Sequence, residues 1–247
     1  MRTQDLGFKT LIQLAEAPTA MERSYPLHAS ANEALAMWEG RVGEIFTFHY
    51  GSQFYRGRLE AGQKTVRLFE TMAYSPEPPA PRLLMQGMPN RERFLWIIEK
   101  AVELGATEIY PIKTEKSYQE EAPSLKKQGG WGRIIRRAAR QCRRAILPTV
   151  GDPVTLEQAI TLSACPNRFY LDRGEMPLQG VGLCGGIEIF VGPEGGWGQE
   201  DLVHFKQNKI LSRNLGPRLL RTETAAITAL SWLASADNPL HPTKAGK

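Results

Sequence analysis

A proline-rich segment at residues 75–81, with the sequence SPEPPAP, divides the chain into two parts whose apolar residues recur with different periods. The segment holds four prolines in seven residues. Proline lacks the backbone N–H that a sheet or a helix interior requires, so such a run forms a stiff linker. We therefore predict two domains, over residues 1–74 and 82–247, joined by this linker.

The part before the linker alternates between apolar and polar residues in three stretches, EIFTFHY, QFYRGRL and KTVRLFETM, between residues 44 and 72. These stretches are rich in aromatic and β-branched residues, and glycine-containing turns separate them. A period of two residues with short turns is the pattern of antiparallel strands. The sequence predicts a small antiparallel β domain here.

The part after the linker alternates between strand-like and helix-like stretches. The run RLLMQGM predicts a strand, RERFLWIIEKAVELG a helix that ends at Gly105, and TEIYPIK a second strand. Further on, RFYLD and IEIFVG are apolar enough for central strands, while QEDLVHFKQN and TETAAITALSWLASA predict helices. This order favours an α/β domain with a mostly parallel sheet.

Composition limits the class of protein. The formal charge of +5 is compatible with a polyanionic partner but is common in proteins that have none. The three cysteines lie far apart without a CxxC pair, and the four histidines lack ligand spacing, so we expect neither disulfides nor a bound metal. No apolar run approaches the roughly 18 residues of a membrane span, and we expect a cytoplasmic protein.

Three glycines, Gly180, Gly182 and Gly185, spell GxGxxG, the nominal dinucleotide-binding motif. That motif requires a strand before it and a helix after it, because the helix N-terminus holds the pyrophosphate. Here the glycines precede the predicted strand IEIFVG. A turn is therefore the favoured interpretation, and a nucleotide-dependent dehydrogenase is disfavoured.

The stretch GPEGGWG, residues 192–198, leaves the carboxyl end of the strand IEIFVG and enters a helix at about Gln199. Ligands of open α/β sheets bind at this edge, and glycines let the backbone approach a ligand closely. A tight turn without function is the alternative. The one carboxylate in the stretch is Glu194, which we interpret as a residue that shapes or caps the loop rather than as a general base.

A second loop, in the run LSRNLGPRLLRTETAAITAL, strengthens the functional interpretation. Gly216 follows the short strand KILS, and Arg218 and Arg221 come after it. Thr222 is a candidate N-cap of the next helix, with Glu223 in its first turn. Two glycine loops that each lead from a strand to a helix predict adjacent walls of one pocket. Ordinary capping by Thr222 and Glu223 is the alternative and does not exclude function.

The segment WGRIIRRAARQCRRAILP, residues 131–148, predicts an arginine-rich helix. Several of its arginines fall on one continuous helix face, and no acid lies between residues 133 and 144. A solvated face usually mixes charges, whereas unmixed arginine favours contacts with phosphate. The face consists of Arg133, Arg137, Arg140 and Arg144, with Arg136 and Arg143 beside it.

Four pieces of the sequence, IEKAVELGATEIYPIKTEKS, AARQCRRAILP, IFVGPEGGWGQEDL and LGPRLLRTETAAITAL, resemble in order and spacing the RsmE family of bacterial 16S ribosomal RNA uridine N3-methyltransferases. The resemblance covers most of the chain after the linker. It implies an α/β methyltransferase domain of the SPOUT class with a C-terminal trefoil knot, and an S-adenosylmethionine (SAM) pocket formed by the knotted loops. It also implies a homodimer, and a small PUA-like β-barrel as an N-terminal domain that helps to hold RNA.

The resemblance also implies a site, residue by residue. SAM is expected to contact Leu171, Asp172, Val191, Gly192, Pro193, Glu194, Gly195, Gly196, Leu215, Gly216, Arg218 and Leu220. The chemistry of the reaction, and not the resemblance, motivates a hypothesis for the second loop, because N3 of uridine must lose a proton: Arg221 places positive charge near the uracil carbonyls or a phosphate, and Glu223 orients Arg221 or relays the proton. The expected partner is ribosomal RNA or the small ribosomal subunit, with Arg133, Arg136, Arg137, Arg140 and Arg144 as RNA contacts.

Two other functions remain open at this point. A SPOUT enzyme could modify a different RNA position, such as a 2′-hydroxyl, with the same cofactor pocket. An RNA-binding protein could keep the scaffold without activity. The sequence also departs from the family pattern at Arg140, where a glutamate is usual, and at Gly198, where a serine N-cap is common. It departs further in HASANEALAMWEGRVGE, residues 28–44, which lacks the N-terminal motifs that touch RNA in the family, so the exact target nucleotide stays open.

Overall fold

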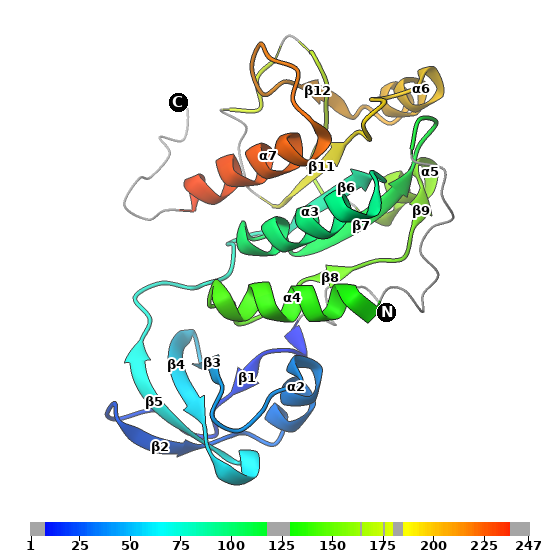
Figure 1. Ribbon diagram of the computed structural model, residues 1–247. Coiled ribbons are helices and arrows are strands. Elements are labelled where there is room, and N and C mark those ends of the chain that lie inside the picture. Colours follow the sequence, from blue (N-terminus) through cyan, green and yellow to red (C-terminus); the bar gives the residue numbers. More distant parts are fainter. Residues whose placement is uncertain (1–7, 118–128, 164, 175, 180–184, 238–247) are drawn as a thin grey trace, which may run out of the picture. The chain divides into compact units, whose positions relative to one another are not determined.

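The computed structural model describes residues 8–117, 129–163, 165–174, 176–179 and 185–237 (Figure 1). The chain forms two compact units, one of Met1–Glu77 with Ile135–Thr149 and one of Pro78–Ile134 with Val150–Lys247. The sequence-based division placed residues 135–149 in the C-terminal domain, whereas their contacts place them in the first unit. This difference bears directly on the arginine-rich helix.

The first unit contains a five-stranded sheet in the order β1-β3-β4-β5-β2. The three predicted strands are β3, β4 and β5, and they pair antiparallel as expected. Edge strands β1 and β2 were not predicted because they are short. An antiparallel bridge pairs Leu14, which follows β1, with Leu27, which follows β2. The elements are β1 (Ile12–Gln13), β2 (Arg23–Pro26), α2 (Ala31–Trp38), β3 (Ile45–Tyr50), β4 (Gln53–Leu59), η1 (Ala61–Gln63) and β5 (Thr65–Thr71).

The second unit contains a sheet in the order β12-β10-β11-β6-β7-β8, with β9 paired to β7. The pairs that join β12, β10, β11, β6, β7 and β9 are all parallel, which confirms the α/β class and the mostly parallel sheet. The strands are β6 (Arg82–Gly87), β7 (Glu108–Lys113), β8 (Thr149–Val150), β9 (Val154–Thr155), β10 (Asn167–Leu171), β11 (Ile187–Val191) and β12 (Leu211–Arg213).

Helices cover both faces of this sheet (Figure 1). On one face α5 and α6 bury a cluster in which Tyr170 stacks on Phe205 with ring centroids 4.4 Å apart. On the other face α7 packs against α3 and β11. The helices of the second unit are α3 (Arg91–Glu103), α5 (Leu156–Leu162), α6 (Gln199–Gln207) and α7 (Thr222–Ala236), whereas α4 (Gly129–Gln141) belongs to the first unit from Ile135 onward. In the described ranges, none of the helices is long and apolar enough to cross a membrane.

The central strand β11 is buried along its whole length, including the carboxylate of Glu188. Burial raises the pKa of Glu188 above its ordinary value, and the nearby Arg168 only partly offsets this. Arg168 Nε lies 2.6 Å from one carboxylate oxygen, and Ser163 Oγ donates to the same oxygen at 2.8 Å. These partners satisfy one oxygen of this buried carboxyl group, while Oε1 has no hydrogen-bond partner among the described residues.

Candidate functional site

The first glycine loop joins β11 to α6 at the carboxyl edge of the sheet. Gly196 adopts φ +68°, a left-handed conformation that favours glycine, and its N–H donates to the Pro193 carbonyl at 2.9 Å. The loop also approaches the end of β6 closely, since a Cβ on Gly87 would lie 2.6 Å from Pro193. Trp197 Nε1 donates to the Leu171 carbonyl at 2.8 Å, which fastens the loop to the end of β10.

Helix α6 begins at Gln199, as predicted, with Gly198 as its N-cap. Because glycine has no side chain, other residues cap this helix. Asp201 accepts from the Gly198 N–H at 2.8 Å, and Glu115 accepts from the Glu200 N–H at 3.3 Å. A Cβ at position 198 would lie 1.8 Å from the Glu115 carboxylate, so Glu115 fills the space that a serine cap would need.

The second glycine loop joins β12 to α7 and is hydrogen-bonded to the first. The Thr222 hydroxyl donates to the Gly192 carbonyl at 2.5 Å and accepts from Gln86 Nε2 at 2.9 Å. The two loops are therefore neighbours, as predicted. The prediction that Thr222 is the N-cap of α7 was wrong: Arg221 occupies the cap position, which leaves the Thr222 side chain to join the loops.

Arg93 on α3 links the carboxylates of the two loops. Its Nη1 lies 2.6 Å from Glu194 Oε1, and its Nε lies 3.7 Å from Glu223 Oε1. Glu194 thus forms an ion pair with the helix beside its loop, which agrees with the interpretation that it shapes the loop. The sequence reasoning missed Arg93, because a lone arginine in the first turn of a helix carries no local signal for partners about 100 residues away.

Two buried acceptor atoms next to Thr222 lack hydrogen-bond donors within the described part of the chain. They are Oε1 of Gln86, a fully buried residue, and Oε2 of Glu223, a residue that is 6% exposed. A buried acceptor without a donor costs about 1–3 kcal/mol. Each loop also contains a glycine with open space beside it. A Cβ added to Gly196 in the first loop or to Gly216 in the second would meet no atom within 4 Å. This edge can therefore hold a ligand that carries N–H or O–H donors.

The two residues expected to act in catalysis, Arg221 and Glu223, do not pair with each other in the structure. Arg221 is exposed and makes no ion pair among the described residues. Glu223 is paired with Arg93 and not with Arg221, so the expected role of Glu223 in orienting Arg221 is not what the structure shows. The remaining predicted cofactor residues lie where expected: Leu171 and Asp172 at the end of β10, Val191 to Gly196 after β11, and Leu215, Gly216, Arg218 and Leu220 before α7.

The arginines of α4 and of the turn after it have acidic partners that are distant in sequence. Four of them form ion pairs with glutamates of the first unit: Arg136 with Glu39 (2.5 Å), Arg140 with Glu44 (3.1 Å), Arg143 with Glu70 (3.0 Å) and Arg144 with Glu77 (2.7 Å). The local sequence contains no acid because the acids come from residues 39–77. In the described ranges, Arg133 and Arg137 are exposed and form no ion pair.

The structure argues against the predicted role of Arg144 as an RNA contact, because the Arg144 side chain is only 3% exposed. Its Nε and Nη2 donate to Glu77 at 3.1 and 2.7 Å, and the backbone N–H groups of Ala145 and Ile146 donate to the other carboxylate oxygen. The pair fixes the end of the linker to the segment after α4 within the first unit. Its role is structural.

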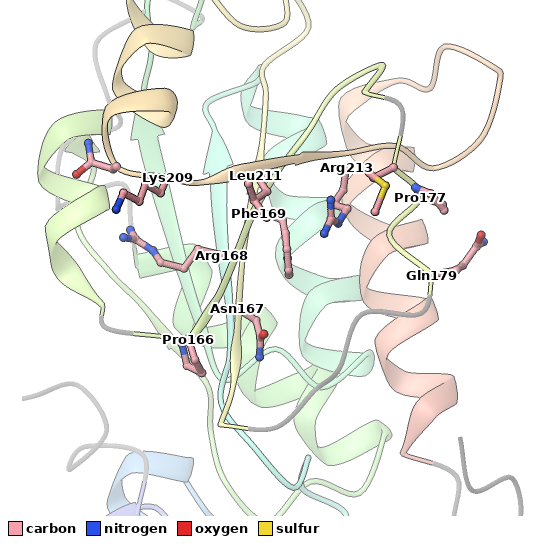
Figure 2. A pocket seen from close by; sticks show the side chains of 11 residues that line it. Pro166, Asn167, Arg168, Phe169, Pro177, Gln179, Lys209, Leu211 and Arg213 are labelled. Atoms are coloured by element: carbon pink, nitrogen blue, oxygen red, sulfur yellow. The ribbon is translucent and has the colours of Figure 1, made fainter. Parts of the chain in front are cut away.

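A cavity of about 580 Å³ lies along β10 and β12 (Figure 2). Its walls include Arg168, Phe169, Lys209 and Arg213, and none of the residues predicted to hold a cofactor. The glycines of the GxGxxG pattern at 180 and 182 fall outside the described residues. Gly185 adopts φ +79° in a turn directly before β11, as a turn requires.

Comparison with known proteins places these observations in a family. The sequence matches the RNA methyltransferase domain family over residues 76–234. A ribosomal RNA small subunit methyltransferase E from Synechocystis is 33% identical over 192 residues, which cover 74% of this chain and 63% of that protein. A protein of the same name from Mesomycoplasma hyopneumoniae is 29% identical over 193 residues, which cover 76% of this chain and 84% of that protein.

A solved structure agrees with the sequence match. It is a methyltransferase from Legionella pneumophila in complex with the cofactor SAM, 28% identical, with a TM-score of 0.63 over 92% of this chain and 98% of that one. The chain spans 63% of the length of the Synechocystis relative, and the family match spans more than half of the chain itself. The chain therefore belongs to the RNA methyltransferase domain family, and it is similar in sequence to proteins named ribosomal RNA small subunit methyltransferase E.

Proposed function

We propose that this protein is a SAM-dependent ribosomal RNA methyltransferase that methylates N3 of a uridine in 16S RNA of the small subunit. One observation carries the proposal beyond family membership. The Thr222 hydroxyl joins the two glycine loops at the carboxyl edge of the sheet, beside two buried acceptors that lack donors. Open α/β sheets bind ligands at this edge.

The residues at this edge fit SAM. Its ammonium, ribose hydroxyl and adenine amino groups are donors, and Gln86 Oε1 is a buried acceptor in need of a donor. Space beside Gly196 and Gly216 leaves room for the molecule against the backbone. The proposed contacts remain Leu171, Asp172, Val191, Gly192, Pro193, Glu194, Gly195, Gly196, Leu215, Gly216, Arg218 and Leu220, to which Gln86 is added.

The chain's own residues would position uridine and handle its proton. SAM, when bound, would supply an electrophilic methyl group on a sulfonium whose sulfur leaves as a neutral thioether. N3 of uridine is weakly acidic and must lose a proton to become nucleophilic. Arg221, exposed at the start of α7, would stabilise the negative charge that develops on the uracil. Glu223 would accept the proton at Oε2, while Arg93 holds Oε1.

Further features are proposed from the family. Helix α7 follows the edge strand β12 yet packs against β11, so the chain returns past β10, which supports a C-terminal knot. The bridge between Leu14 and Leu27 joins the edges of the N-terminal sheet, which supports a PUA-like barrel. We further propose that the protein is a homodimer and that it acts in the cytoplasm on ribosomal RNA or the small ribosomal subunit. Arg133 and Arg137 on α4 are kept as proposed RNA contacts.

The reaction is tested by product identification. The protein is incubated with labelled SAM and unmodified small-subunit RNA or particles, and the digested nucleosides are identified by mass spectrometry. We expect 3-methyluridine. A 2′-O-methylated nucleoside would indicate a SPOUT enzyme with another target. Absence of methylated product together with no SAM binding in calorimetry would indicate an RNA-binding protein without activity.

The ion pair between Arg93 and Glu194 should contribute to SAM affinity and not to the chemical step. We expect Glu194→Gln and Arg93→Ala each to weaken SAM binding by roughly fivefold, as a partly exposed pair worth about 1 kcal/mol would. For Glu194→Gln, turnover at saturating SAM should be retained, because Glu194 accepts hydrogen bonds from Asn90 and Arg93 at the start of α3 and is not proposed to contact the uridine. Calorimetry and steady-state kinetics measure the two quantities.

The double variant provides the control for this pair. If Arg93 acts on the cofactor loop through Glu194, the double variant should bind SAM about as weakly as either single variant. Arg91→Ala, an exposed cation on the same turn of α3, should leave SAM affinity unchanged. Loss of turnover at saturating SAM in Glu194→Gln would show that this carboxylate takes part in chemistry.

A further inference from the structure

The cavity along β10 and β12 has a lining that suits a nucleotide (Figure 2). It contains cations and amides but no carboxylate, together with an apolar wall. Cations recognise phosphate, amides pair with base edges, and apolar side chains contact base faces. The lining consists of Pro166, Asn167, Arg168, Phe169, Met176, Pro177, Gln179, Asn208, Lys209, Leu211 and Arg213.

Two of the cations lack an acidic partner in the ranges that the structure describes. The Lys209 side chain is exposed and forms no ion pair. Arg213 lies over the ring of Phe169, 4.8 Å from its centroid, with a single bond from Nη1 to the Ser212 carbonyl and no partner for its buried Nε. Arg168 differs, because Glu188 already neutralises it. The cavity thus carries uncompensated positive charge at Lys209 and Arg213.

Apolar side chains at the cavity are exposed to solvent to an unusual degree. Leu211 is 52% exposed, although it is the register partner of the buried Phe169, and Met176 in the same lining is 58% exposed. In the view of Figure 2, Lys209 lies on one side of Leu211 and Phe169, and Arg213 lies on the other. An apolar surface between two cations matches the alternation of base and phosphate along a single strand of RNA.

The cavity adjoins the proposed cofactor edge. Arg213 is the register partner of Leu171 in the parallel pair of β12 and β10. The Asp172 N–H donates to the Arg213 carbonyl at 3.0 Å. A strand of RNA in the cavity would therefore pass directly beside the loop that is proposed to hold SAM.

We propose that this cavity binds a nucleotide of the substrate RNA, with its phosphates on Lys209 and Arg213 and its base against Leu211 and Met176. The inference rests on the proposed function and names where the substrate lies on the second unit. It adds to the contacts proposed for Arg133 and Arg137 on α4; on the same helix, glutamates already neutralise Arg136 and Arg140. An uncompensated cation gains more from a phosphate than one already paired.

The test uses fluorescence anisotropy of the full-length protein with a labelled single-stranded oligoribonucleotide. We expect Lys209→Gln to raise the dissociation constant about threefold, and Lys209→Gln with Arg213→Gln about tenfold or more. Each lost phosphate contact should reduce the slope of log affinity against log salt by about 0.7. Lys206→Gln, an exposed cation on α6 outside the cavity, should change the affinity by less than twofold.

Further measurements separate this inference from others. SAM affinity, measured by calorimetry, should be unchanged in Lys209→Gln. Uridine monophosphate at millimolar concentration should compete only weakly; competition as strong as that of RNA would assign the cavity to a free nucleotide and overturn the RNA proposal. Unchanged affinity and salt slope in both cavity variants would also overturn it. Failure of the wild-type protein to bind SAM would refute the proposed function while leaving the RNA result interpretable.

Discussion

Replacing Arg221 with alanine should lower turnover by about 100-fold or more while SAM affinity stays within about twofold, because removal of one group that stabilises transition-state charge costs about 3 kcal/mol. Arg221 caps α7 at the carboxyl edge of the sheet, directly before Thr222, whose hydroxyl holds the neighbouring loop. Its guanidinium is exposed and has no acidic partner in the described chain, so it can meet an anionic uracil. Its charge is needed as the reaction proceeds and not for cofactor binding.

Two variants control this measurement. Arg221→Lys retains the charge and should recover part of the turnover lost in Arg221→Ala. Thr224→Ala, at an exposed position in the first turn of α7, should leave turnover unchanged and so reports any effect on the helix itself. Single-turnover kinetics at saturating SAM is the measurement. Full activity of Arg221→Ala would assign charge stabilisation to another residue.

Replacing Arg144 with alanine should destabilise the protein by about 3–5 kcal/mol, the cost of leaving one partner of a buried ion pair uncompensated. Arg144 is 3% exposed and Glu77 11% exposed, so solvent can compensate neither charge. Among the described residues, removal of the guanidinium leaves the Glu77 carboxylate with the N–H groups of Ala145 and Ile146 as its donors. The contact with the end of the linker should weaken as a result.

Urea denaturation of Arg144→Ala measures this loss, with Arg137→Ala as the matched control. Arg137 lies on α4 two turns earlier, is exposed and forms no ion pair in the described ranges, so its replacement should change the unfolding free energy by less than about 0.5 kcal/mol. The opposite result, with Arg144→Ala stable but impaired in RNA binding, would restore the interpretation of Arg144 as an RNA contact.

Local signals in the sequence accounted for most of the regular elements. Strands β3, β4 and β5, the alternation of β6, α3 and β7, and the start of α6 at Gln199 agree with the periods and turn residues that predicted them. Strands β1, β8 and β9 are two residues long, too short for a period to be detected. The N-cap of α7 was misplaced because threonine is a good cap by type, whereas here its hydroxyl is bonded to Gly192.

The sequence by itself determined the α/β class, the two glycine loops at strand ends and the family motifs, because periodicity and the conformational freedom of glycine act over a few neighbouring residues. Only the tertiary structure decided which charges are compensated. Arg144 meets Glu77, which is 67 residues away, and Arg93 meets Glu194, which is 101 residues away. Lys209 and Arg213 keep their charge available beside a cavity. A charge's role depends on its neighbours in space, and the fold brings those neighbours together from distant parts of the chain.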